Sequence, residues 1–145
     1  MRKSEIVSIS QKGKQIIEKL ACASYPDEFC GILFGTELES GHVKVSECCP
    51  ADNVSPRDKG KHFLIDPIEL YRYELSYSKK GEEIIGFAHS HPDAMAVLSV
   101  EDQEKMIPGQ LYMILEIRDG NCKDCRIYRK KLFDETITEV SMQFI

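Results

Sequence analysis

Apolar residues near the start of the chain recur every three or four positions, whereas later apolar residues come in short runs. The first pattern is typical of an amphipathic helix, because side chains three and four residues apart share one helical face. Serine is a favoured N-cap, and proline interrupts a helix. The sequence therefore predicts a helix that begins after Ser10 and ends before Pro26, with an apolar face made of Ile16, Ile17, Leu20 and Ala21.

Two further helices are indicated by the residues that would begin them. Asp66-Pro67-Ile68-Glu69 combines a capping aspartate, a proline at the first helical position and an acid in the first turn. We expect this helix to run to about Lys80. Ser99 can cap a shorter helix that runs to about Ile107 and ends before Pro108.

Short apolar runs flanked by glycine, proline or polar residues predict the strands. These runs lie at residues 29–34, 43–48, 84–89, 111–117, 126–130 and 136–144. Pro92 should end the third strand, since proline cannot donate to a sheet ladder. The polar stretch 50–62 contains two prolines and Gly60, and so predicts a loop.

The order of these elements limits the fold class. Helices mixed with a largely consecutive set of strands predict an α/β or α+β fold, in which helices pack on a central sheet. No internal repeat or Gly/Ser-rich linker interrupts the series, and 145 residues suit one domain. We therefore expect a single domain over residues 1–145.

Composition and charge argue against a nucleic-acid partner. The chain is 42% hydrophobic and 30% charged, an ordinary balance for a folded protein. Its formal charge is −5 and its pI is about 5.4, whereas nucleic-acid binding requires a basic face. One dense basic cluster is expected on a solvated strand edge and consists of Arg126, Arg129, Lys130 and Lys131.

The cellular compartment is predicted from the absence of recognisable membrane-spanning and signal segments. No stretch approaches the roughly 18 apolar residues of a membrane span. The basic start, Met1-Arg2-Lys3, is followed by no apolar run of the kind found in signal peptides. We expect a cytoplasmic protein without a membrane partner, in which the six cysteines are reduced thiols.

Cys122 and Cys125 form a CxxC pattern in a stretch that the sequence predicts to be a hairpin loop. A structural zinc site would need two further ligands, which the adjacent Cys48 and Cys49 do not supply at a suitable spacing. A redox motif of the thioredoxin type would open a helix. We therefore expect ordinary thiols here, with a redox role as the alternative.

The most informative residues surround His89 and His91. Residues two apart on a strand point to the same face, about 6.6 Å apart along the chain, so both imidazoles can face one point. Ten residues separate His91 from Asp102, which lets the first turn of the next helix return a carboxylate to that point. Two imidazoles and one carboxylate leave a fourth position for water, the arrangement of catalytic rather than structural zinc.

Each of these features alone also has a purely structural interpretation. Two histidines on a strand can be ordinary residues with satisfied hydrogen bonds. Ser99 and Asp102 are three residues apart, which is close to the capping-box pattern of a helix start. Glu28, at the junction between the first helix and the first long strand, can be a solvated acid, and Asp27 a turn residue. His42 and His62 lie in turn or loop contexts and are not expected to be ligands.

Taken together, the pattern resembles the JAMM motif of the MPN-plus (Mov34-type) metalloproteases. The matching residues are His89-Ser90-His91-Pro92, then Ser99 and Asp102, with Glu28 upstream in the segment Pro26 to Gly35. The resemblance implies an MPN-type sandwich, similar to cytidine deaminases, with a central mixed sheet flanked by helices. It implies one zinc ion per chain held by His89, His91 and Asp102, Glu28 as general acid/base, and Ser99 as a hydroxyl that stabilises the oxyanion rather than a nucleophile.

The sequence departs from the family at one position. The family usually has proline before the motif serine, and this chain has Leu98. The residue shapes the loop rather than touching the metal, so the difference bears on the rigidity of the loop more than on ligation.

The small stand-alone bacterial members that this chain resembles process ubiquitin-like sulfur-carrier proteins. The resemblance therefore implies a peptidase that hydrolyses the amide bond after a C-terminal Gly-Gly of such a carrier. Two alternatives stay open: a deubiquitinase-like isopeptidase with the same chemistry, and a non-catalytic MPN-type binding scaffold. The carrier, the leaving group, the pathway and the oligomeric state are not determined by the sequence.

Overall fold

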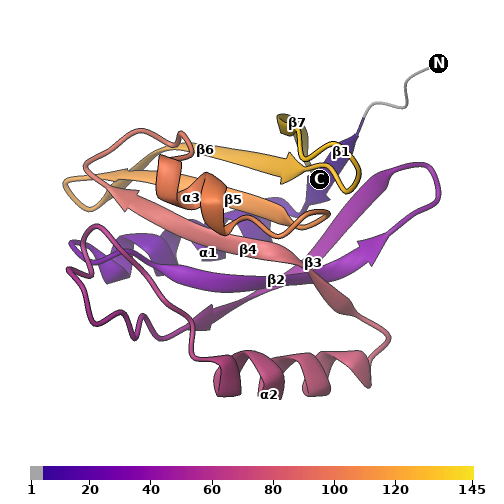
Figure 1. Ribbon diagram of the computed structural model, residues 1–145, viewed down its shortest axis with the longest axis horizontal. Coiled ribbons are helices and arrows are strands. Elements are labelled where there is room, and N and C mark those ends of the chain that lie inside the picture. Colours follow the sequence, from indigo (N-terminus) through magenta and orange to yellow (C-terminus); the bar gives the residue numbers. More distant parts are fainter. Residues whose placement is uncertain (1–4) are drawn as a thin grey trace.

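A computed structural model describes residues 5–145 of the chain. It contains a seven-stranded sheet and three helices (Figure 1). In chain order the elements are β1 (Ile6–Ile9), α1 (Gln11–Ser24), β2 (Cys30–Glu37), β3 (His42–Ala51), α2 (Pro67–Ser78), β4 (Glu83–Pro92), α3 (Val100–Lys105), β5 (Leu111–Arg118), β6 (Asn121–Lys130) and β7 (Ile137–Phe144).

The sheet is mixed and closes on itself in the order β1-β3-β2-β4-β5-β6-β7. β1 pairs in parallel with both β3 and β7, and β4 pairs in parallel with β5, whereas the other neighbours are antiparallel. The prediction of a mixed sheet with flanking helices is confirmed at this level. Closure was not predicted, because it depends on β1, whose four residues are too few to show a pattern in the sequence.

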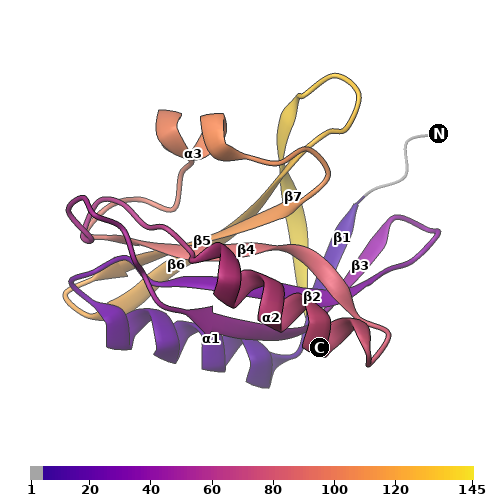
Figure 2. The same cartoon turned by 60° about the horizontal axis from the view of Figure 1, so that its bottom comes forward.

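The helices cover different parts of the sheet. α1 and α3 lie on opposite sides of it, and α2 lies beside β2 and β4 (Figure 2). α1 contributes Ile17 and Ala21 to the main hydrophobic core, where they pack with strand residues such as Leu33, Leu115 and Ile127. None of the helices within residues 5–145 has the length and apolar character needed to cross a membrane. The expectation about a leader rests partly on residues 1–4, which lie outside the described residues.

The predicted helix starts are confirmed by their capping hydrogen bonds. The backbone N–H of Gly13 donates to Ser10 Oγ at 2.9 Å. The N–H of Ile68 donates to Asp66 Oδ1 at 2.9 Å, and Pro67 takes the first helical position. These bonds satisfy amides that have no partner within the helix.

Two of the expectations about local structure are wrong, and one is confirmed. The Cys122-to-Cys125 segment is not a loop, because it belongs to β6, which starts directly after the turn at Asp119 and Gly120. The expectation that Pro92 ends the third long strand is confirmed, because this proline is the last residue of β4, at a position paired with Ile117. α3 ends at Lys105 rather than near Ile107.

Arg129 also differs from its prediction as part of a solvated basic edge. Its side chain is buried and donates from Nη1 to Glu5 at 2.9 Å and to Glu37 at 3.0 Å, and from Nε to the carbonyl of Gly109 at 3.0 Å. A buried guanidinium is stable only when its donors find such partners. These partners are distant in the sequence, so the burial of Arg129 could not be inferred from its basic neighbours.

The close approach of β4 to β5 generates a prediction about Gly86. A Cβ at this position would overlap the backbone carbonyl of Leu111, its partner in β5, and a backbone atom cannot move aside alone. Gly86→Ala should therefore lower the free energy of unfolding by about 3 kcal/mol, the scale of overpacking. Gly81→Ala is the control, because Gly81 has open space around it and only its φ of 77° opposes a side chain, at a cost of about 1 kcal/mol. Urea unfolding of both variants measures the difference, and equal stability would contradict the packing argument.

Candidate metal centre

Three side chains predicted to be metal ligands converge on one point. His89 and His91 extend from the same face of β4, and Asp102 comes from the first turn of α3. The two Nε2 atoms are 3.3 Å apart. Asp102 Oδ1 lies 3.3 Å from His89 Nε2, and Asp102 Oδ2 lies 3.0 Å from His91 Nε2. The structure thus brings together residues from two elements that are separated by an irregular loop.

These distances fit a small cation. Four ligands placed tetrahedrally at zinc bond lengths of roughly 2.0–2.2 Å lie about 3.3 Å from one another. The nitrogen and oxygen atoms of this trio are already near that spacing, and imidazole with carboxylate is a donor set suited to zinc. His89, His91 and Asp102 therefore can hold a zinc ion with little rearrangement.

The orientation of the imidazole rings supports the same conclusion. His91 Nδ1 lies 2.7 Å from the carbonyl oxygen of Met95, which can only accept a hydrogen bond. The hydrogen of a neutral His91 therefore belongs on Nδ1, which leaves the Nε2 lone pair for a cation. The ring of Phe63 stacks on His89 with centroids 4.7 Å apart and restricts its rotation. His89 Nδ1 is buried and has no hydrogen-bond partner among the described residues.

Asp102 and the two histidines shift one another's pKa values. Burial alone would raise the pKa of Asp102, but hydrogen bonds from His89, from the protonated form of His91 and from the Ser99 backbone outweigh it and hold that pKa far below its usual range. Burial lowers the pKa of His89. Burial opposes the charged form of His91 as well, but the Asp102 carboxylate and the Met95 carbonyl prevail, so the pKa of His91 is raised. Asp102 is thus anionic at neutral pH, ready to balance a cation.

Glu28 stands immediately beside this trio. It lies between α1 and β2, as predicted, and only 5% of its surface is exposed. One of its carboxylate oxygens lies within 4.8 Å of ligand nitrogens of both His89 and His91, so Glu28 is a possible third ligand in place of Asp102. The shorter distances to Asp102 favour Asp102 as the ligand. Burial raises the pKa of Glu28 to about 8, which suits a group that takes up and releases protons near neutral pH.

The structural interpretation of Ser99 and Asp102 as a capping box is confirmed. The N–H of Asp102 donates to Ser99 Oγ, and the N–H of Ser99 donates to Asp102 Oδ2, both at 3.0 Å. The box positions Asp102 without occupying all of the Ser99 hydroxyl, whose hydrogen remains available as a donor. Leu98, the departure from the family motif, packs against a small core that includes Ala96 and Tyr112. Packing therefore anchors the loop at the position where the family usually has proline.

A residue that the sequence did not single out holds the backbone of Glu28. The Asn53 side-chain amide donates to the carbonyl oxygens of Glu28 at 3.3 Å and His62 at 3.0 Å, and its Oδ1 accepts from Ser55 and Leu64. The N–H of Glu28 donates to the carbonyl of Lys59 at 2.6 Å. The loop between β3 and α2 thus fixes Glu28. Asn53 has no characteristic spacing from the motif residues, so no sequence signal identified it.

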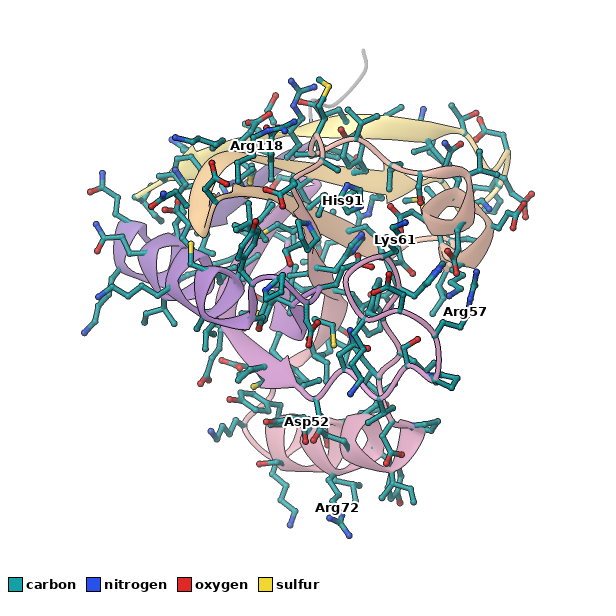
Figure 3. All side chains as sticks on the ribbon, turned by 90° about the vertical axis from the view of Figure 1, so that its left-hand side faces the viewer. Asp52, Arg57, Lys61, Arg72, His91 and Arg118 are labelled. Carbon is teal, nitrogen blue, oxygen red and sulfur yellow. The ribbon has the colours of Figure 1, made fainter. Side chains whose placement is uncertain are left out.

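Two hollows in the surface share Glu28. One, of about 560 Å³, is lined by residues including Glu28, Lys61, His91, Met95, Ser99 and Asp102, and Lys61 and His91 lie close together in Figure 3. The other, of about 590 Å³, is lined by residues including Glu28, Phe29, Asp52, Asn53, Val54 and Lys59. Glu28 therefore borders both hollows.

The remaining histidines and cysteines do not join the site. His62 Nδ1 pairs with Glu101 Oε2 at 2.9 Å, and His42 Nε2 lies 2.8 Å from Ser8 Oγ. All six cysteines are free. Within residues 5–145, Cys122 and Cys125 take part in no group of three ligand atoms close enough to share a metal ion.

Comparisons with known proteins give one family match and one curated relative. Residues 10–129 match the family described as prokaryotic homologs of the JAB domain. A desampylase of Haloferax volcanii is 33% identical over 95 residues, which are 65% of this chain and 66% of the relative, slightly less than two thirds of its length.

Two solved structures share the fold. A protein from Desulfitobacterium hafniense has a TM-score of 0.82 at 24% identity, and the match covers 97% of this chain and 92% of that chain. A protein from Salinibacter ruber has a TM-score of 0.70 at 22% identity, with 95% and 90% covered. At these identities the likeness concerns the fold alone, a mixed α+β architecture with a β-rich core.

The first prediction of this site concerns metal content. We expect purified protein to carry close to one zinc ion per chain, and the double variant His89→Ala/Asp102→Ala to lose it, because two of three ligands are gone. His62→Ala is the matched control, a nearby histidine that bonds Glu101 instead, and should retain zinc. Elemental analysis decides between the two carboxylates as well: loss of zinc from Glu28→Gln with retention in Asp102→Asn would make Glu28 the third ligand.

The second prediction concerns pH. A cation binds neutral imidazole, so zinc must displace any proton on His91, whose pKa is raised. Zinc affinity should therefore fall as the pH drops through that pKa, by about tenfold per pH unit below it. Because the pKa of Asp102 is lowered far below neutral pH, its protonation contributes nothing to the pH dependence of zinc affinity near neutral pH. Glu28→Gln is the sample of choice, because burial raises the pKa of Glu28 to about 8 and the glutamate would add its own pH dependence. Calorimetric zinc titrations between pH 5.5 and 8 measure the slope, and a constant affinity would exclude His91 as a ligand.

Proposed function

Because the chain belongs to the family of prokaryotic homologs of the JAB domain, we propose that it is a zinc-dependent peptidase acting on a ubiquitin-like protein. In this proposal His89, His91 and Asp102 hold the zinc, Glu28 is the general acid/base and Ser99 stabilises the oxyanion. Residues 1–145 act as one domain. The observation that carries the proposal is the convergence of three ligand atoms at zinc spacing beside a buried glutamate.

The chemistry follows from the position of each group. Zinc held by the trio would supply Lewis acidity, which lowers the pKa of water and polarises the substrate carbonyl. Glu28 takes the proton of the attacking water and delivers it to the departing amine, a cycle for which a pKa near 8 is suitable. The Ser99 hydroxyl, held by its capping bond, donates its hydrogen to the oxyanion.

We propose further that the cleaved bond follows the C-terminal Gly-Gly of a ubiquitin-like sulfur carrier. The name of the Haloferax relative, desampylase, supports a ubiquitin-like protein as the substrate class. A diglycine tail has no side chains, so it can reach a glutamate that is only 5% exposed. The two hollows that meet at Glu28 offer room for the tail on one side and the leaving group on the other. Six free cysteines fit a reducing compartment such as the cytoplasm, where we place the reaction.

The isopeptidase alternative has one observation in its favour. The name desampylase denotes removal of a modifier from a protein, which suits a lysine-linked substrate as well as a tail residue. The non-catalytic scaffold has none, since this chain retains all three candidate ligands and the glutamate. A panel of carriers, each ending in Gly-Gly plus one residue or in Gly-Gly linked to a lysine side chain, separates the two enzymes.

The decisive variant is Glu28→Gln. Glutamine keeps the size of the side chain but cannot accept the proton, so we expect zinc content to be unchanged and turnover to fall about 100-fold or more. Asp27→Asn, a neighbouring acid outside the zinc trio, is the matched control and should keep most activity. Mass spectrometry of a carrier with an extended Gly-Gly tail follows cleavage. Full activity of Glu28→Gln would refute the mechanism, and tight binding of the carrier without cleavage by the wild type would favour the scaffold.

A further inference from the structure

Ser90, the residue between the two candidate histidine ligands, is fully buried and faces away from the metal side of β4. Successive side chains of a strand alternate between its two faces, so Ser90 cannot share the ligand position of His89 and His91. Its side chain instead contacts the backbone next to Glu28. The proposed roles of the zinc ion, Glu28 and Ser99 do not involve this contact.

Two hydrogen bonds connect Ser90 to Phe29, the residue that follows Glu28. The N–H of Ser90 donates to the carbonyl oxygen of Phe29 at 3.0 Å, as in an antiparallel ladder. In the return direction, the N–H of Phe29 donates to the Ser90 side-chain oxygen, Oγ, at 2.7 Å, where a regular ladder would use a carbonyl. The Ser90 hydroxyl thereby extends the β2–β4 pairing one step beyond Cys30 and His89, the last pair of the regular ladder.

We propose that Ser90 is a positioning residue, which fixes the Glu28 carboxylate relative to the metal ligands on either side of it. The peptide bond between Glu28 and Phe29 is held from one side by Ser90 and from the other by Asn53, which donates to the Glu28 carbonyl at 3.3 Å. The same three-residue stretch of β4 thus supplies two ligands and the brace for the base. A displacement of about 1 Å in a catalytic group costs up to about 100-fold in rate, so such a brace matters to turnover.

A purely structural role of Ser90 would lead to a different experimental result. A buried serine that only satisfies an amide would affect folding and leave the chemistry of folded molecules unchanged. Ser8 provides the comparison, because it is also a buried serine on a strand and its Oγ lies 2.8 Å from His42 Nε2, away from the site. The two serines are therefore matched in burial, and each side-chain oxygen has a hydrogen-bond partner, but only Ser90 contacts the backbone next to Glu28.

The test rests on the proposed function and is a double-mutant cycle with Glu28 on a carrier ending in Gly-Gly plus one residue. Ser90→Ala should keep its zinc and its KM but lose about tenfold in kcat, whereas Ser8→Ala should keep its kcat. In the Glu28→Gln background, Ser90→Ala should cause no further loss, since a brace has no effect on a base that is absent. Ser90→Thr, which keeps the hydroxyl, should restore most of the rate.

A second measurement does not depend on activity. Exchange of the Phe29 amide hydrogen, followed by NMR in zinc-free protein, should be faster in Ser90→Ala than in wild type and unchanged in Ser8→Ala. If Ser90→Ala does not fold, Ser90→Cys, with a weaker acceptor of similar size, takes its place in both measurements.

The outcomes separate the two proposals. Equal losses of kcat from Ser90→Ala with and without Glu28, loss of zinc from Ser90→Ala, or an equal effect of Ser8→Ala would overturn the role of Ser90. An unimpaired Glu28→Gln single variant would instead overturn the role of Glu28, and with it the premise on which the inference rests.

Discussion

The antiparallel register that sets Cys30 opposite His89 brings the start of β2 and the end of β4 to the same place. Glu28 precedes the first of these strands by two residues, and His91 follows the paired histidine by two, so the register fixes the distance between Glu28 and the two histidines. A slip of one residue would turn both histidines to the other face of the sheet. The closed arrangement of strands keeps β4 between β2 and β5. Because Gly86 has no side chain, β4 can approach β5 closely, and both features protect this register.

The candidate site keeps polar groups in a largely buried setting. His89 Nδ1 lacks a partner among the described residues, and Glu28 carries its carboxylate into a pocket that favours the protonated form. Such groups cost free energy when they are buried. Asp102 offsets part of this cost by bonding both imidazoles and the amide of Ser99. In the function proposed above, such a preassembled set of side chains would have little to reorganise on binding a metal ion.

The sequence predicted the elements with strong local signals and missed those that depend on distant partners. Ser10 and Asp66 cap their helices as expected, because a capping bond reaches only two or three residues along the chain. β1 and the buried Arg129 were missed, since their partners lie far away in the sequence. The same distinction between local signals and distant partners applies to the candidate metal centre. The spacing of His89, His91 and Asp102 identified a trio that the structure brings together, whereas Asn53 became apparent only from the fold.

The closure of the sheet by β1 has a consequence for how the protein folds. Ile6 pairs with Ser141, so one of the β1 ladders joins segments from nearly opposite ends of the sequence, while the β5–β6 hairpin joins immediate neighbours. Contacts of high sequence separation form slowly, because a long stretch of chain must be ordered before they are made. We therefore expect the hairpin of β5 and β6 to form early and the β1–β7 seam to form last, so that during synthesis the sheet stays open until β7 has left the ribosome.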